Sequence, residues 1–248
     1  MLNSSGLERR GLAIFYGTLC HGLFLLAVGF AMVTMYMGMT PGYLVHLPKP
    51  LAALWDGLLL LQFPLLHSFL LTRKGGGKLA RLAPKRYAGT LSTTLFATAA
   101  SLQMCLLYLC WSPVGSVWWK AEGLTKAVLT ALYLGSWLLL GKSMVDSSLA
   151  VQAGYLGWLS LFRGRQPNYP DMPETGLFQH CRHPIYLAYI LIVWTVPVWT
   201  PDQLAVALCL TTYCLLGPLH KEARYLRRYG PRFESYRSRT PYLLPRRS

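Results

Sequence analysis

Residues 185–219 read IYLAYILIVWTVPVWTPDQLAVALCLTTYCLLGPL, and this apolar run decides the fold. It is too long for one membrane span, because a helix needs about 20 apolar residues to cross the bilayer core. A polar, helix-breaking cluster interrupts the run, as is typical of a tight turn between two helices. The cluster comprises Pro197, Thr200, Pro201 and Asp202. We therefore predict a hairpin of two transmembrane helices.

Four upstream runs are each long and apolar enough for one further span. They cover residues 13–35, 51–71, 89–111 and 126–145. Hydrophobic residues make up 53% of the 248 and charged residues only 13%, which is the wrong balance for a soluble protein. We predict an all-α polytopic membrane protein with about six transmembrane helices in a single domain. Its parts are the four N-terminal spans in 1–145, a cytosolic loop in 146–183, the helical hairpin in 184–219 and a cytosolic amphipathic segment in 220–248.

The distribution of basic residues predicts the orientation. Six spans leave Lys49, Lys120 and Lys126 on one side and all other Lys and Arg on the opposite side, which the positive-inside rule makes cytosolic. Both termini are then cytosolic, and we expect the protein in a bacterial inner membrane. This topology explains the net charge of +15 better than nucleic-acid binding does. An interfacial aromatic belt is expected on the minority side, formed by Trp111, Trp118 and Trp119.

Several common chemistries are not indicated by the sequence. The six cysteines lie mostly within apolar runs and form no CxxC pair, so neither a disulfide framework nor a metal site is predicted. A Walker-type loop, HExxH, GxSxG, and GxGxxG after a strand are also missing. A site in this protein is therefore expected between helices and polar segments at one face of the membrane.

Residues 175–186, TGLFQHCRHPIY, place two histidines and an arginine directly before the hairpin. Pro184 suits the first turn of a helix, where its missing amide hydrogen would have had no partner. The segment is either part of a reaction site or an interfacial anchor in which Arg182 and His183 face lipid headgroups.

The hairpin is followed by a strongly basic segment that contains one unexpected carboxylate. Glu222, Leu226 and Tyr229 fall on one helical face, and Gly230-Pro231 should end that helix. A basic amphipathic tail on anionic lipid explains the arginines. It does not explain Glu222, because an unpaired charge within a turn of the membrane is costly.

His67 lies inside an apolar run near the cytosolic end of the second predicted span. An ionisable residue within a span is a candidate functional residue, and hydrogen bonding between helices is the alternative. Asp56 lies toward the opposite end of the run and is interpreted as structural or cavity-lining. Asp146 ends the fourth predicted span and is a further candidate.

Two motifs flank the predicted hairpin. Before it stands Arg182-His183-Pro184-x-Tyr186; after it come Glu222, Gly230 eight residues later, Tyr236 six beyond, and Arg239-Thr240-Pro241. Together they resemble the isoprenylcysteine carboxyl methyltransferase superfamily of integral membrane methyltransferases.

The upstream chain resembles the branch that contains methanethiol S-methyltransferases and nurim. The matching features are His67-Ser68, Pro84-x-Arg86-Tyr87, residues 111–115 and residues 190–200. There are two departures from the superfamily. It often has two adjacent Glu where this chain has Lys221-Glu222, and a Tyr where this chain has Phe233.

The resemblance implies S-adenosylmethionine as the cofactor, in a pocket at the cytosolic mouth of the hairpin that the C-terminal segment closes. The implied cofactor-binding residues are Arg182, His183, Pro184, Tyr186, Glu222 and Tyr236. Arg182 and Glu222 suit the carboxylate and ammonium of the cofactor, and the two tyrosines offer ring faces. Methyl transfer to a thiol also needs a proton acceptor, for which His67 and His183 are candidates, so the expected catalytic residues are His67, His183 and Glu222.

We therefore expect a methyltransferase whose preferred acceptor is a small thiol such as methanethiol. One alternative is a lipid or isoprenylcysteine-like acceptor. Another is a nurim-like membrane protein without catalysis, and a third is a sterol-type membrane reductase with a nicotinamide cofactor. The expected partners are a small-molecule or lipid-soluble acceptor and membrane lipid, and no nucleic acid.

Overall fold

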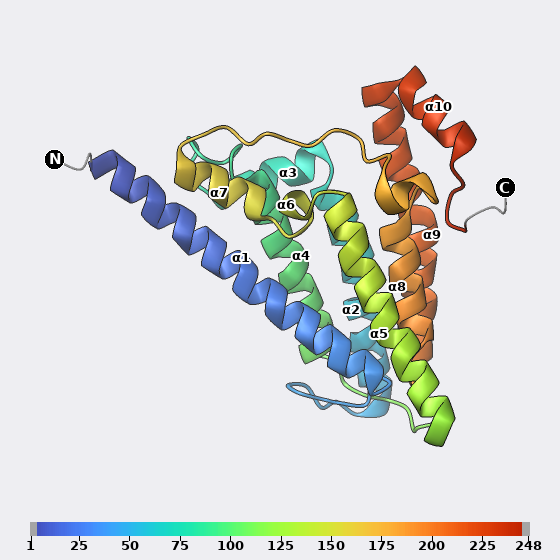
Figure 1. Cartoon of the computed structure of the whole chain (residues 1–248). Helices are drawn as coiled ribbons and strands as arrows, with labels where there is room; N and C mark the ends of the chain where they lie inside the picture. Colours follow the sequence, from blue (N-terminus) through green and yellow to red (C-terminus); the bar gives the residue numbers. More distant parts are fainter. Residues whose placement is uncertain (1–3, 245–248) are drawn as a thin grey trace. The chain divides into compact units, whose positions relative to one another are not determined.

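The computed structural model describes residues 4–244 (Figure 1). It is almost entirely α-helical, and the described residues contain two strands of two residues each. The chain divides into two compact units. Within the described residues, unit 1 comprises residues 4–33, 42–112 and 148–169, and unit 2 comprises residues 34–41, 113–147 and 170–244.

Five helices are long and apolar enough to cross a membrane, which confirms the all-α polytopic fold. They are α1 (Ser4–Tyr36), α2 (Lys49–Leu70), α4 (Ser92–Leu109), α5 (Gly123–Asp146) and α9 (Pro201–Tyr229). Helix α8 (Pro184–Trp194) stands where the fifth predicted span begins, but its 11 residues are too few to cross the bilayer core alone. The count of about six spans therefore stays a prediction.

In unit 1, α2 packs against α4, and the short helix α3 (Arg73–Ala80) contacts both. Helices α6 (Leu149–Gln152) and α7 (Tyr155–Arg163) lie in the segment predicted to be a loop. The loop prediction is wrong here because residues 155–163 supply a short apolar face that packs on α4. The contact is fixed by the hydroxyl of Thr94, which accepts a hydrogen bond from Trp158 N at 2.9 Å.

Two residues of unit 1 bear on interpretations made from the sequence. The side chain of Asp56 is buried, and its Oδ1 accepts a hydrogen bond from Ser112 N at 3.0 Å, which gives it a structural role. Trp111 is 1% exposed, so its assignment to an interfacial belt is wrong, and it is a packing residue instead. Trp118 and Trp119 are exposed, as a belt requires.

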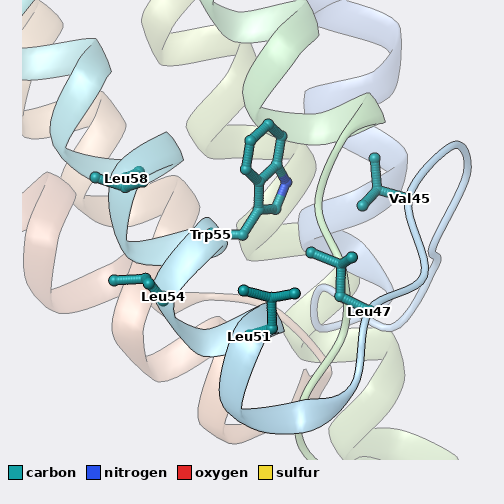
Figure 2. A pocket seen from close by; sticks show the side chains of 6 residues that line it. All are labelled: Val45, Leu47, Leu51, Leu54, Trp55 and Leu58. Carbon is teal, nitrogen blue, oxygen red and sulfur yellow. The ribbon is translucent and has the colours of Figure 1, made fainter.

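An apolar hollow of about 380 Å³ lies on unit 1, between the first turns of α2 and the segment that precedes it (Figure 2). It is lined by Val45, Leu47, Leu51, Leu54, Trp55 and Leu58. The indole of Trp55 donates a hydrogen bond to Cys110 O at 2.8 Å, which fixes the ring at one wall. This apolar lining suits a hydrocarbon group. It offers a charged group no hydrogen bonds to replace those that the group makes with water.

In unit 2, α8 packs against both α5 and α9. Helices α8 and α9 form the predicted hairpin, and the turn between them contains β2 (Val198–Trp199), which pairs antiparallel with β1 (Trp119–Lys120). Asp202 holds this end together, since its carboxylate accepts hydrogen bonds from Val114 N at 3.1 Å and Gly115 N at 2.8 Å.

Helix α9 continues beyond the apolar run and ends at Tyr229, as Gly230-Pro231 predicts. Gly230 has a φ of +49°, a conformation that favours glycine, and α10 (Pro231–Arg239) begins directly after it. The predicted segment 220–248 is thus largely helical as far as Arg239, and its last residues, 245–248, lie outside the described part of the chain.

Candidate functional site

The hairpin of unit 2 brings the motif before α8 next to the distal half of α9 (Figure 1). His183 is the N-cap residue of α8, and Pro184 occupies the first helical position, as predicted. Because α9 runs back along α8, Glu222 returns to the point where α8 begins. The two halves of the sequence motif therefore meet in space.

Glu222 is the centre of the site. Its Oε1 accepts a hydrogen bond from Arg182 Nε at 2.8 Å and is 2.8 Å from His183 Nε2. The side chains of Arg182 and Glu222 are each 11% exposed, and that of His183 is 3% exposed. A charge this deeply buried is tolerated when it is paired and hydrogen-bonded, so these contacts explain the carboxylate that a basic lipid-binding tail left unexplained.

Arg182 also fastens the segment around the end of α10 to the site. Its backbone N–H donates to Pro241 O at 2.9 Å, and its Nη1 donates to Arg237 O at 3.0 Å and to Thr240 O. The ring of Tyr242 lies 5.5 Å from the guanidinium carbon. The guanidinium thus holds a carboxylate on one side and backbone carbonyls on the other.

The protonation of His183 follows from its surroundings. Burial lowers the pKa of His183 below its ordinary value, and the hydrogen bond to Glu222 offsets part of that effect. A carboxylate only accepts hydrogen bonds, so the neutral imidazole carries its hydrogen on Nε2. The other nitrogen, Nδ1, then keeps a lone pair, is buried, and has no hydrogen-bond partner among residues 4–244.

The short helix η1 (Gly176–Gln179) positions the chain that leads into Arg182. At one end, the Oδ2 of Asp146 in α5 accepts a hydrogen bond from Leu177 N at 2.8 Å. At the other, the Tyr236 hydroxyl in α10 donates to Phe178 O at 2.6 Å. Burial raises the pKa of Tyr236, so its hydroxyl stays a neutral donor.

Exposed ion pairs connect the segment before η1 to α10. Arg232 lies 2.5 Å from an oxygen of Asp171 and 2.8 Å from one of Glu174, and Arg239 lies 2.6 Å from the other Glu174 oxygen. The hydrogen bond from Arg232 holds the pKa of Asp171 below its usual range. Met172, in the same segment, is buried in the apolar cluster that contains Phe233.

The structure brings together some of the predicted site residues. Arg182, His183 and Glu222 are in direct contact, and the ring of Tyr186 lies 5.8 Å from that of His183. The Tyr236 hydroxyl donates to Phe178 O in η1, and its ring lies 6.4 Å from that of Phe233, so its contact with the cofactor stays a prediction.

His67 lies in unit 1, in the last turn of α2. Its ring stacks on that of Phe63 at 5.2 Å and meets the edge of Phe96 at 4.9 Å. Its catalytic role stays a prediction.

Tyr242 is a site residue that the sequence did not single out. Its ring meets that of His183 at 4.7 Å, and its hydroxyl donates to Leu215 O at 2.8 Å. Its position directly after Arg239-Thr240-Pro241 was the available signal, since a residue adjoining a motif is held close to that motif's contacts.

Within residues 4–244, no three His, Cys, Asp or Glu side chains are grouped as metal ligands would be. The contacts of Arg182 and His183 with Glu222 suit the group to hydrogen bonding, ion pairing and proton transfer.

Comparison with known proteins gives a consistent set of relatives. No family model and no solved structure matches the chain. It is 26% identical over 200 residues to a methanethiol S-methyltransferase from a Pseudomonas species, which covers 80% of this chain and 75% of the relative. Identity to the methanethiol S-methyltransferase of Crocosphaera subtropica is 24% over 258 residues, with 98% and 95% covered. Identity to nurim from Mus musculus is 32% over 188 residues, with 70% and 68% covered.

Proposed function

Because the chain belongs to the methanethiol S-methyltransferase and nurim branch of the isoprenylcysteine carboxyl methyltransferase superfamily, we propose that it is a membrane methyltransferase that uses S-adenosylmethionine to methylate a small thiol. The observation that carries the proposal is the buried contact of Arg182 and His183 with Glu222. The relatives named methanethiol S-methyltransferase support a methyltransferase and motivate the choice of a thiol.

The residues present fit the amino-acid end of S-adenosylmethionine. Nη2 of Arg182 and Oε2 of Glu222 make no hydrogen bond within residues 4–244, although the other polar atoms of these groups do. They offer a donor for a carboxylate and an acceptor for an ammonium, which leaves the lone pair of His183 Nδ1 for a proton. When bound, the cofactor would supply an electrophilic methyl group.

His183 is the proton acceptor in this proposal. A cysteine thiol has a pKa of about 8.5, and thiols react as the thiolate, so a base beside the acceptor increases the reactive fraction at neutral pH. His183 Nδ1 carries the lone pair needed, and Glu222 holds the imidazole in that tautomer through Nε2. An apolar acceptor would reach the site laterally from the bilayer, and a lipid or isoprenylcysteine-like acceptor is the alternative substrate class.

A nurim-like protein without catalysis is the second candidate. Nurim is 32% identical to the chain, more than the 24% and 26% of the two methyltransferases above. Lys221 also stands where the superfamily often has a second Glu, and its ammonium lies 5.5 Å and 5.3 Å from the rings of Phe178 and Tyr225. A cation at this position removes any role that needs paired carboxylates.

One binding experiment separates the two candidates. Titration of S-adenosylmethionine into the detergent-purified protein should show saturable binding, weakened at least about 100-fold by Glu222→Ala, since a buried charge-assisted contact is lost. Glu234→Ala is the matched control because Glu234 is an exposed carboxylate of α10. Failure of the intact protein to bind would leave the non-catalytic candidate, and binding of a nicotinamide cofactor instead would favour a reductase.

Product analysis then identifies the acceptor. The protein is supplied with methyl-labelled S-adenosylmethionine and a panel of thiols, lipids and isoprenylcysteine analogues. We expect the label in the methyl thioether formed from a small thiol. Label found only in lipid or isoprenylcysteine products would show that those compounds are the acceptors.

We also propose that the site faces the cytosol. The C-terminal segment that forms part of the site is rich in basic residues from Lys221 onward, and such segments face the cytosol. The relatives come from bacteria and from mammals, so the bacterial inner membrane stays a prediction. Protease accessibility of a tag at the C-terminus in right-side-out and inverted vesicles measures the orientation directly.

A further inference from the structure

A second hollow of about 250 Å³ lies in unit 2 at the turn of the hairpin. It is lined by Tyr36, Met37, Thr40, Val117, Lys120, Ala121, Lys126, Pro197 and Val198. These residues come from the end of α1 and the segment after it, the β1 segment, the first turn of α5, and the hairpin turn as far as the first residue of β2. No residue of the Arg182, His183 and Glu222 group takes part in this lining.

The hollow and the Glu222 site lie at opposite ends of the same helices. Val198 precedes α9, and Glu222 lies 20 residues beyond Asp202 in that helix. At 1.5 Å per residue this is about 30 Å, which is also about the thickness of the bilayer core. If the Glu222 site lies at one membrane interface, the hollow therefore lies at the other.

Positive charge is what the hollow offers a ligand. The Tyr36 hydroxyl is 2.8 Å from Thr130 Oγ1, which itself donates to Lys126 O, so the Tyr36 hydrogen points to Thr130. Thr40 donates its hydroxyl hydrogen to Met37 O. The free donors among the lining side chains in residues 4–244 are thus the ammonium groups of the two lysines.

The nearby carboxylates do not neutralise these lysines. Asp202 is buried and holds the backbone of Val114 and Gly115. Glu122 is exposed and lies four residues before Lys126, but it does not line the hollow and forms no ion pair with either lysine in the described residues. An anion is therefore the complementary ligand.

The rest of the lining favours an amphiphile over a free ion. Met37, Val117, Pro197 and Val198 give the hollow an apolar wall beside the two charges. Two exposed indoles stand in the sequence between the lining residues Val117 and Lys120, with Trp118 59% and Trp119 45% exposed. Tryptophan rings of this kind mark the depth of lipid headgroups, where a phosphate and an apolar glycerol backbone meet.

We propose that this hollow binds the phosphate group of an anionic membrane lipid from the leaflet opposite the Glu222 site. Lys120 and Lys126 pair with the phosphate, and the apolar wall contacts the glycerol and the first acyl carbons. The lipid would hold β1, the hairpin turn and the end of α1 together, since all three line the hollow. This site is separate from the proposed methyl transfer and does not depend on it.

Native mass spectrometry of the full chain in detergent tests the proposal. The intact protein should retain phosphatidylglycerol in preference to phosphatidylcholine. The double variant Lys120→Gln with Lys126→Gln should retain about tenfold less phosphatidylglycerol, because two charges near an anionic headgroup are lost. Lys74→Gln with Lys85→Gln makes the same charge change at exposed positions of unit 1 and should retain as much as the intact protein.

Further arms separate lipid from free anion and binding from misfolding. Lys120→Arg with Lys126→Arg keeps both charges and should retain the lipid. Retention by this variant would show that the glutamine variant loses lipid through its lost charges and not through misfolding. Equal retention by the intact protein and the glutamine double variant, or equal retention of the two lipids, would overturn the proposal. So would lysine-dependent stabilisation by inorganic phosphate without retained phosphatidylglycerol, because the site would then take a free anion.

Discussion

His183 in unit 2 and His67 in unit 1 are both histidines beside apolar helices, and they can be compared by the neighbours described for each. His183 is 2.8 Å from a buried carboxylate, whereas His67 lies against the rings of Phe63 and Phe96. A carboxylate fixes the tautomer of an imidazole and stabilises the imidazolium that forms when it takes a proton. The carboxylate therefore favours His183 as the base, and the catalytic role of His67 stays a prediction.

Alanine at each histidine is the test with the largest expected effect. His183→Ala should lower kcat for methyl transfer by about 1000-fold, within the range for loss of a general base, while Arg182 and Glu222 can still pair. His67→Ala should lower kcat less than about tenfold. Initial rates with a saturating thiol in reconstituted vesicles measure both, and the reverse order would assign the base to His67.

Glu222→Gln tests whether the charge on the carboxylate matters, since the amide keeps the size and an acceptor oxygen. Two hydrogen bonds lose their charged acceptor, at a cost of about 1 to 2 kcal/mol each, so kcat/KM should fall about 100-fold. Glu234→Gln, at an exposed position of α10, is the control. Unchanged kcat/KM in Glu222→Gln would mean that hydrogen bonding alone orients His183.

The pH dependence of stability provides a test without substrate. Burial lowers the pKa of folded His183 below 6.5, so the unfolded chain takes up this proton at a higher pH than the folded one. Acid therefore favours unfolding, and this contribution to stability is lost as the pH falls below 6.5 toward the folded pKa. The difference in unfolding temperature between the intact protein and His183→Gln should change by a few degrees between pH 7 and pH 5. A constant difference would mean that His183 titrates normally.

Much of this arrangement was accessible from the sequence because it depends on local patterns. Apolar runs located α1, α2, α4 and α5, and Gly230-Pro231 located the end of α9. The resemblance implied a common pocket for Glu222 and the residues before Pro184, and the antiparallel hairpin brings them together. The carboxylate itself was notable only because its charge needed a partner near the membrane.

The remainder depends on contacts that no local pattern encodes. Arg182 bonds the carbonyls of Arg237 and Thr240, and any residue type supplies a carbonyl, so the sequence could not indicate them. Helix α7 is stabilised by packing on α4 rather than by a long apolar run, and it was therefore assigned to a loop. Trp111 shows the opposite error, because an indole suits a buried core as well as an interface.

Glu174→Gln has the smallest expected effect and tests how much the His183 arrangement depends on exposed ion pairs. Glu174 bonds Arg232 and Arg239, whose side chains are 51% and 61% exposed, and screening by water makes such pairs weak. The free energy of unfolding should fall by about 1 kcal/mol or less, and by less still in high salt. Arg237→Gln, at another exposed arginine of α10, changes one charge without breaking these pairs and is the control. Because the backbone of Arg182 and the hydroxyl of Tyr236 also hold this segment, cofactor affinity should change less than about threefold. A tenfold loss of affinity would show that the exposed pairs, and not the buried contacts, keep the segment over His183.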